Sequence, residues 1–263
     1  MNILVAPFVN ALFGINLLLG NLGWSVVVVT ILIRLLLLPI IIPSLKSAGK
    51  MRELQPRLRK LQEKYGKDKE GLAKAQMDLY KQEGINPLSG CLPNVLQIAI
   101  LLLFFSAFNM TTAFLSGKGS VEQVNSYLVE PLRINDEFKF NQYFLGSDLT
   151  QTPASLFKQG VSLGWWLPVI LLLGSGLLQY LSSKLMMGEA KHERVNQSAY
   201  TEATPEKTDD MMEAMRTQST YMMPLMTVVI GWNFSLGILL YWFVNSAVML
   251  GQQVIVERIG ENE

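Results

Sequence analysis

The sequence has very little of what enzymatic and metal sites are usually built from. Its 263 residues include one cysteine, Cys91, and one histidine, His192. A single cysteine excludes an internal disulfide and a multi-cysteine metal site, and the histidine stands in a polar stretch, where we expect it to be solvated. No nucleophile–base pair, metal-ligand set or phosphate-binding loop is apparent. We therefore predict no enzyme, no catalytic residue, no metal and no cofactor.

Charge is also scarce and unevenly placed. Only 16% of the residues are charged, whereas 50% are hydrophobic. Of the 22 lysines and arginines, 11 fall within residues 44–88. Apolar runs long enough to cross a bilayer recur elsewhere, which is typical of helical membrane proteins rather than of the short alternating strands of a membrane barrel. The sequence therefore predicts an all-α integral membrane protein.

One charged residue breaks this segregation. Arg34 stands in the middle of the apolar run GWSVVVVTILIRLLLLPIII, and Thr30 lies one turn before it on the same helix face. An arginine at this depth costs roughly 2.5–3.5 kcal/mol on insertion scales, so it is expected to face a wet cavity or a partner. No aspartate or glutamate lies in the other predicted spans. We therefore interpret Arg34 as a cation available to a transient partner.

Hydropathy divides the chain into ten consecutive segments. They are an interfacial N-terminal helix (1–21), a first span (22–43), a cytoplasmic helical hairpin (44–88), a second span (89–115), an extracytoplasmic loop (116–163), a third span (164–185), a cytoplasmic loop (186–219), a short fourth span (220–234), a fifth span (235–256) and a cytoplasmic tail (257–263). For the first segment, a packed cap on the helices is an equal alternative. The fourth and fifth spans share so few residues that the fourth is expected to be short.

The hairpin has the pattern of two antiparallel helices. Apolar residues recur at intervals of three and four along its first arm, which is typical of a coiled-coil seam, and Pro56 is expected to kink that arm. Asp68 is a candidate N-cap for the second arm, which Gly84 ends. The basic tip can be a solvated face or a contact for anionic lipid headgroups or ribosomal RNA, through Lys64, Lys67 and Lys69.

Orientation follows from the placement of the basic residues. The hairpin carries 11 lysines and arginines, against four in the loop 116–163. The positive-inside rule places the hairpin and the C-terminus in the cytoplasm and the N-terminus outside. Trp24, Trp165, Trp166 and Trp232 all fall at the outer boundary in this arrangement, as an aromatic belt requires. The predicted location is the bacterial plasma membrane, crossed several times.

Several neutral polar side chains lie inside the other spans. They can hydrate a cavity around Arg34, or they can bond helix to helix at about 0.6–2 kcal/mol each. Those that we assign to a candidate groove are Asn94, Gln97, Gln179 and Asn245.

Several motifs together resemble the YidC/Oxa/Alb family of membrane protein insertases. They are GWSVVVVTILIRLLLLP, MRELQPRLRKLQEKYGKD, MDLYKQEGINPLSGCLPNVLQI, YMMPLM, SLGILLYWFVN and GQQ, in this order along the chain. Ser89 departs from the expected NPLGGC, and the outer loop is longer than usual. The large extracytoplasmic domain of some bacterial members is not seen in this sequence.

The resemblance implies five transmembrane helices around a hydrophilic groove that is open to the cytoplasm and to lipid. It implies that Arg34 is the groove arginine, Thr30 its neighbouring threonine, Gln179 the polar position of the third span and Trp242 the aromatic position of the fifth. The implied partners are nascent membrane proteins, the ribosome and anionic phospholipids. Whether the protein works alone or beside the Sec translocon stays open. DNA is not an expected partner.

Three functions remain open from the sequence. The first is an insertase that hydrates an outward-bound, often acidic segment of a nascent chain and releases the apolar remainder into lipid. The second is an anion or solute channel or transporter that uses Arg34 as its anion site, although no self-similar halves are visible. The third is an assembly factor with the hairpin as its docking arm.

Overall fold

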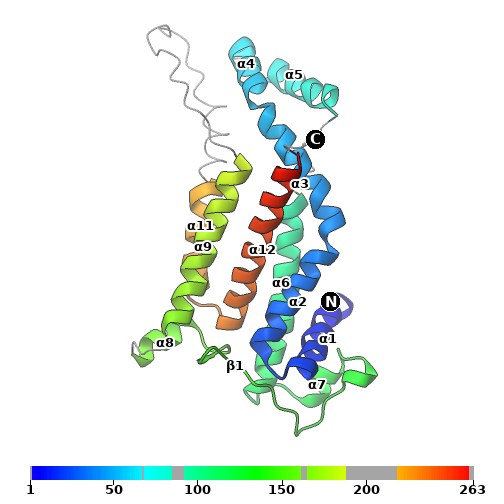
Figure 1. The fold of residues 1–263 in the computed structure, drawn as a ribbon, viewed down its shortest axis with the longest axis vertical. Coiled ribbons are helices and arrows are strands. Elements are labelled where there is room, and N and C mark those ends of the chain that lie inside the picture. Colours follow the sequence, from blue (N-terminus) through cyan, green and yellow to red (C-terminus); the bar gives the residue numbers. More distant parts are fainter. Residues whose placement is uncertain (1, 67, 85–91, 161–164, 188–217, 261–263) are drawn as a thin grey trace. The chain divides into compact units, whose positions relative to one another are not determined.

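The computed structural model describes residues 2–66, 68–84, 92–160, 165–187 and 218–260, and Figure 1 shows its ribbon. Cys91, His192, Lys67 and most of the loop 186–219 lie outside these ranges. The regular elements of the described part are helices except for one antiparallel pair of short strands, in which Tyr143 pairs with Asp148. The prediction of an all-α membrane protein is confirmed.

The described chain forms a series of helices and two short strands. In chain order they are α1 (Asn2–Leu19), α2 (Leu22–Leu36), α3 (Leu38–Glu53), α4 (Gln55–Tyr65), α5 (Lys69–Gln82), α6 (Leu92–Leu115), α7 (Val121–Asn125), the 3-10 turn η2 (Glu130–Leu132), β1 (Tyr143–Phe144), β2 (Ser147–Asp148), α8 (Pro153–Gln159), α9 (Trp166–Met187), the π-helical turn η5 (Gln218–Met222), α11 (Met223–Gly231) and α12 (Leu236–Gly260).

Three described helices, α6, α9 and α12, are long and apolar enough to cross a membrane. The pair α2 and α3 would make a fourth as one broken span. The apolar helix over Thr220–Gly231 is shorter, as expected for the fourth predicted span. Length and composition therefore support three or four spans, and the predicted count of five stays a prediction.

The first predicted span is not one continuous helix. The chain leaves the helical path at Leu37, and a new helix begins at Leu38. Pro39 explains the interruption, because it has no N–H to bond to the carbonyl of Leu35 and its ring restricts Leu38. Hydropathy alone does not reveal this, because the residues on both sides are equally apolar.

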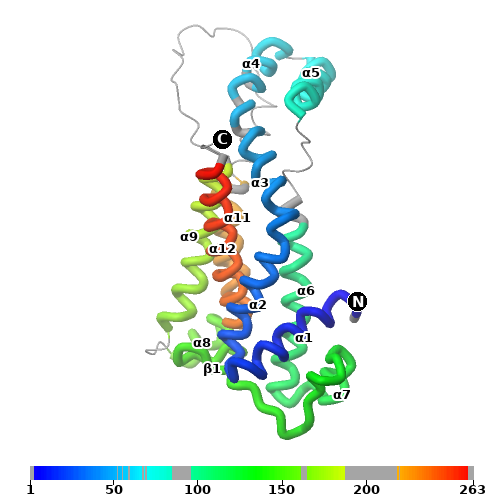
Figure 2. Tube along the Cα trace, turned by 45° about the vertical axis from the view of Figure 1, so that its right-hand side comes forward, coloured from blue at the N-terminus to red at the C-terminus, as the bar shows by residue number. Residues whose placement is uncertain are grey.

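The described contacts divide the chain into two compact units. The first consists of Met1–Leu38, Asn94–Leu178 and Leu225–Met249, and the second of Pro39–Pro93, Gln179–Pro224 and Leu250–Glu263. In the first unit, α2, α6 and the first half of α12 run side by side in both Figure 1 and Figure 2. Aromatic rings fill the space between α6 and α12, where Tyr241 stacks on Phe104 at 4.1 Å between ring centroids.

Helix α1 packs against this unit through one face and exposes the other. Val9 and Phe13 are fully buried, whereas Ile3 is 88% exposed and Leu18 is 80% exposed. The helix therefore packs through one face and presents an apolar face to its surroundings; that it lies at a membrane interface stays a prediction.

Residues 116–160 are folded over one end of the first unit. Their carbonyls accept hydrogen bonds from N–H groups at the N-terminus of α12, from Leu236 to Gln151 at 2.8 Å and from Gly237 to Leu149 at 3.0 Å. The N–H of Leu22, at the start of α2, bonds to the carbonyl of Asn141. Helix N-termini leave such donors without an intrahelical partner, so this segment satisfies them and ties the helix ends together.

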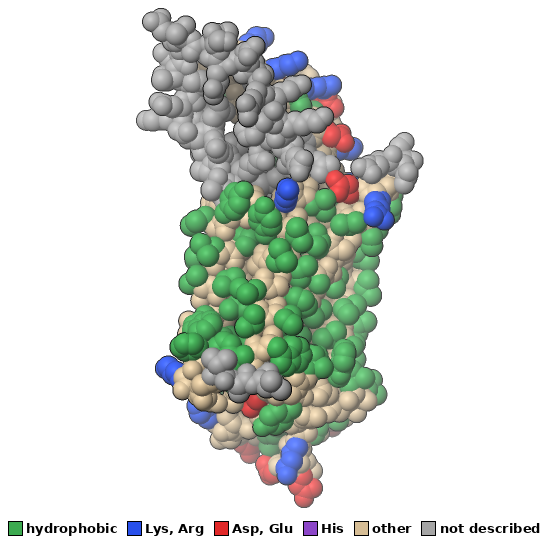
Figure 3. Space-filling model, turned by 60° about the vertical axis from the view of Figure 1, so that its left-hand side comes forward, with side chains coloured by type: hydrophobic (Ala, Val, Ile, Leu, Met, Phe, Trp, Pro, Cys, Tyr) green, Lys and Arg blue, Asp and Glu red, His purple; other side chains and the backbone are tan. Residues whose placement is uncertain are grey.

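Aromatic residues gather at the same end. Trp24 contacts Phe144 edge-on, and Trp165 lies 6.1 Å from Trp232 between ring centroids. On the face shown in Figure 3, hydrophobic side chains gather over the middle of the surface. All charged residues of the first unit except Arg34 fall within residues 118–158.

The hairpin belongs to the second unit. Leu54 and Leu58 are buried between α4 and α5, against Leu79 and Tyr80. Pro56 does not kink a continuous arm: α3 ends at Glu53 and α4 begins at Gln55, so the proline occupies the first turn, where its missing N–H costs nothing. The side chain of Asp68 accepts a hydrogen bond from the N–H of Gly71 and caps α5.

Candidate functional site

Three polar side chains from three helices meet inside the first unit. Arg34 of α2 donates from Nε to Oδ1 of Asn245 in α12 and from Nη2 to Oε1 of Gln97 in α6, each at 2.5 Å. Arg34 is 5% exposed and Asn245 is 3% exposed. The structure thus brings together three residues that sequence analysis assigned to a groove, across separations of 63 and 211 positions.

The position of Arg34 follows from the helical periodicity of α2. Arg34 is the last buried residue of this helix, and Val26 and Thr30 precede it on the same face at intervals of four. The other buried residues are Leu22, Gly23, Ser25 and Val29. Leu32, Leu35 and Leu36 are exposed. Because residues three and four apart share a face, the arginine points into the helix bundle, and the apolar side chains point outward.

Thr30 is buried one turn before Arg34. Its hydroxyl donates to the carbonyl of Val26 at 2.6 Å, within its own helix. Ser175 in α9 does the same with Leu171 at 2.6 Å. These hydroxyl protons therefore serve the local helix rather than bonds between helices. The hydroxyl oxygens keep their capacity to accept a further hydrogen bond.

Tyr241 was not singled out from the sequence, yet it is one of the most deeply buried residues. It is 1% exposed, and its hydroxyl has no hydrogen-bond partner among the described residues. It also interacts electrostatically with Arg34. A buried hydroxyl without a partner costs about 1–3 kcal/mol, so its retention beside a cation marks it as a candidate site residue. The sequence feature that could have indicated Tyr241 is its position next to Trp242 in the motif Leu-Tyr-Trp.

Trp242, the predicted aromatic site residue, is half-buried and lies 6.0 Å from Phe234 between ring centroids. Gln179 is half-buried in the second unit, on α9. At the hairpin tip, Lys64 is exposed, and its Nζ lies over the ring of Tyr65 at 5.6 Å. The side chains of Asn94 and Lys69 lie outside the described part of the structure, as does Lys67.

Two cavities of the first unit involve residues between 116 and 160, and neither is lined by Arg34. Among the contacts described for Arg34 are hydrogen bonds to two neutral amide oxygens. Because an amide carries no net charge, these two bonds hold the guanidinium without neutralising it. The arrangement can bind an anion but contains no pair suited to proton transfer or nucleophilic attack.

Buried polar residues among apolar helices define a helical membrane protein with a buried arginine side chain, Arg34, among its helices. The family model described as 60Kd inner membrane protein matches residues 14–263. The chain therefore belongs to this family of multi-pass bacterial inner-membrane proteins, the YidC/Oxa family that its motifs resemble.

Three curated relatives carry the name membrane protein insertase YidC. The protein of Legionella pneumophila (strain Corby) is 29% identical over 239 residues, 91% of this chain and 33% of the relative. That of Francisella tularensis subsp. novicida is 29% identical over 244 residues, which cover 93% of this chain and 34% of the relative. That of Dinoroseobacter shibae is 47% identical over 107 residues, which cover 41% of this chain and 17% of the relative. The chain thus spans about a third of the length of the first two relatives.

Proposed function

We propose that this protein is a membrane protein insertase. It would take nascent membrane proteins into the polar centre between α2, α6 and α12 and release them sideways into the bilayer. The observation that carries the proposal is the pairing of a buried Arg34 with the neutral oxygens of Gln97 and Asn245. The names of the relatives support the same activity.

The neutral partners make exchange with a substrate favourable. A hydrogen bond from guanidinium to carboxylate is roughly twice as strong as one between neutral groups, so an acidic side chain of a nascent chain competes well with an amide. The hydroxyl of Tyr241 offers a second donor to the same carboxylate. Until the substrate arrives, the hydrogen bonds from the guanidinium to the amide oxygens of Gln97 and Asn245 would offset part of the cost of burying the charge.

Entry of a substrate requires the helices to part. Arg34 is only 5% exposed, so a nascent segment would displace Gln97 or Asn245 as it reaches the guanidinium. This requirement favours short hydrophilic segments, since each residue that enters must replace existing contacts. The apolar remainder then leaves into lipid, which contributes about 25 cal/mol per Å² of apolar surface buried, and no nucleotide is needed.

The surroundings fit the exit step. The short apolar helix over Thr220–Gly231 would thin the bilayer locally and shorten the distance that the hydrophilic segment must cross. Exposed apolar side chains of α9 and α11, among them Leu173 and Val229, present a hydrocarbon-like surface to a departing segment. Orientation follows the positive-inside rule, with the N-terminus outside and the hairpin and C-terminus in the cytoplasm.

The hairpin would receive the substrate on the cytoplasmic side. Its basic tip, Lys64, Lys67 and Lys69, would contact anionic phospholipid or the ribosome through phosphate groups. The Sec translocon is a further partner by family resemblance. Deleting the hairpin while keeping substrate cross-links to the polar centre would separate delivery from insertion.

Site-specific photocross-linking tests the proposal directly. A photoreactive amino acid replaces Thr30, Gln179 or Trp242 in the full chain, and ribosomes stalled on a membrane protein supply the substrate. We expect cross-links to the nascent chain at these positions. Leu36, 77% exposed on the outer face of α2, is the matched control and should give none. Equal labelling at Leu36, or anion flux through the reconstituted protein without a translating substrate, would favour the channel instead.

A further inference from the structure

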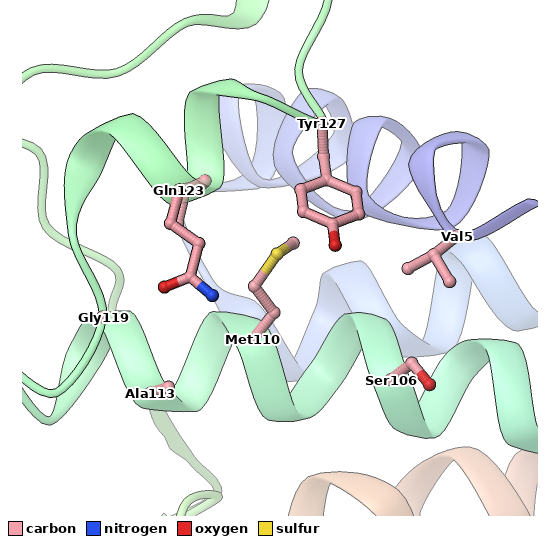
Figure 4. A pocket seen from close by; sticks show the side chains of 8 residues that line it. Val5, Ser106, Met110, Ala113, Gly119, Gln123 and Tyr127 are labelled. Atoms are coloured by element: carbon pink, nitrogen blue, oxygen red, sulfur yellow. The ribbon is translucent and has the colours of Figure 1, made fainter. Parts of the chain in front are cut away.

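A cavity in the first unit lies away from the polar centre. It has a volume of about 130 Å³ and lies between α1, α6 and the segment around α7. Figure 4 shows Met110 and Tyr127 extending into it, with Val5 of α1 at one side and Gln123 of α7 at the other. Ser106 and Ala113 of α6 form its floor.

The cavity is partly open to the surface of the first unit. Its volume is close to the roughly 150 Å³ of an engineered apolar cavity in another protein, which stays dry and takes up small apolar molecules. It is too small for a typical drug-sized ligand, whose pockets measure about 300–1,000 Å³. A ligand of this size is a small apolar group, such as the end of one hydrocarbon chain.

The lining changes from polar to apolar across the cavity. Gln123 is exposed and lies on α7 between the exposed polar residues Ser120 and Ser126. At the other side, Val5 belongs to α1, an uncharged helix whose neighbouring Ile3 and Leu4 are 88% and 63% exposed. On α6, Leu102 is 59% exposed one turn before Ser106. Exposed apolar surface of this kind in a membrane protein lies against lipid, so the cavity opens beside hydrocarbon.

We propose that this cavity binds one acyl chain of a membrane phospholipid. The hydrocarbon would pack against Val5, Met110 and Ala113, and the amide of Gln123 would lie beside the ester group near the headgroup region. This order of contacts reproduces the change from glycerol ester to hydrocarbon along a phospholipid. The bound chain would fill the space under α1 and stabilise its packing. This inference does not depend on the insertase activity.

The test uses the full chain reconstituted in vesicles of phosphatidylethanolamine and phosphatidylglycerol, with a phosphatidylethanolamine that carries a diazirine at the end of one acyl chain. After irradiation, mass spectrometry locates the labelled peptides. We expect labelling in α1, α6 and the residues near Tyr127. The variant Ala113→Leu fills the cavity and should reduce this labelling about tenfold, which corresponds to ~1.4 kcal/mol. Ala99→Leu, at an exposed position of the same helix, is the matched control and should keep it.

Three results would overturn the proposal. Equal labelling in Ala113→Leu and Ala99→Leu would mean that only lipid at the outer surface reacts. Absence of label from the lining peptides would mean that hydrocarbon does not enter. Labelling by a diazirine fatty acid, but not by the phospholipid, would assign the cavity to a free acid. If Ala113→Leu lowers the unfolding temperature, Ser106→Leu fills the same cavity from another position and replaces it in the comparison.

Discussion

Arg34 Nε donates a hydrogen bond to Asn245 Oδ1 at 2.5 Å and joins α2 to α12 inside the bundle. The acceptor is neutral, as is Gln97 Oε1 on the other side of the guanidinium. A carboxylate at either position would form a stronger bond and compensate the charge. The proposed mechanism therefore depends on the difference between an amide and an acid.

The first prediction replaces that amide. Asn245→Asp replaces a neutral acceptor of Arg34 with a fixed carboxylate, so a substrate carboxylate must compete with a charged acceptor there. We expect insertion of substrates with acidic translocated tails to fall about tenfold, equivalent to ~1.4 kcal/mol, and insertion of neutral tails to change little. Protease protection of the translocated tail in reconstituted vesicles measures both.

Gln97→Glu should act in the same way as Asn245→Asp, because it modifies the second acceptor. Asn109→Asp, at an exposed position of α6, controls for the effect of adding a carboxylate anywhere in the membrane. Unchanged insertion of acidic tails by both Asn245→Asp and Gln97→Glu would contradict the proposal that a substrate carboxylate replaces an amide acceptor of Arg34.

The second prediction concerns the charge of Arg34 itself. Arg34→Ala should impair substrates with acidic tails more than apolar ones, and Arg34→Lys should retain more activity than Arg34→Ala, because it keeps the positive charge and loses only the planar geometry. The same protease-protection assay gives the ratio between the two substrate classes. An equal loss for both classes in a folded protein would show that the arginine is structural.

The third prediction concerns the contact between α12 and α6. A Cβ at Gly237 would lie 1.9 Å from the ring of Phe108. Gly237→Ala should therefore destabilise the fold by about 1–3 kcal/mol, the usual cost of overpacking, and lower the unfolding temperature in detergent. Gly251→Ala, in the same helix with open space around it, should be neutral or slightly stabilising. Adding Phe108→Leu to Gly237→Ala should recover part of the loss. Equal effects at both glycines would reject the close approach.

The fourth prediction concerns Asn10, which pairs with the backbone of Tyr127 and Val129. Its side chain donates to the carbonyl of Tyr127 at 2.7 Å and accepts from the N–H of Val129 at 2.8 Å. Asn10→Ala removes both bonds and leaves these groups to water, at a cost of about 1–3 kcal/mol. Hydrogen exchange of the Val129 amide should accelerate, whereas exchange in the middle of α6 should not. Unchanged exchange at Val129 would mean that the pairing does not hold the segment.

Much of the membrane architecture was predictable because the hydrophobic effect acts on local composition. The second predicted span ends at Leu115, as α6 does. Asp68 caps α5 because a short acceptor side chain before a helix satisfies a free N–H wherever it occurs. The breaks at Leu37 and Leu54 were harder to foresee, since prolines 39 and 56 can bend, cap or interrupt a helix.

The site was predictable in part for the same reason. Arg34 and Thr30 share a face by periodicity alone, whereas nothing local indicates that Gln97 and Asn245 are the two acceptors. Tyr241 illustrates the limit most clearly: in Leu-Tyr-Trp either aromatic can face inward. The rotation of α12, set by packing against Phe104, determines that Tyr241 is buried and Trp242 is half-exposed.

The amino-acid sequence by itself determined that this is a helical membrane protein with Arg34 in an apolar run, because composition and helical periodicity are local properties, and its motifs resemble the YidC/Oxa family. Only the tertiary structure decided that Arg34 is buried and which side chains contact it, how residues 141–151 satisfy helix N-termini, and where a cavity remains between α1 and α6. Those features depend on contacts between residues far apart in the chain, and the packing of whole helices selects such contacts.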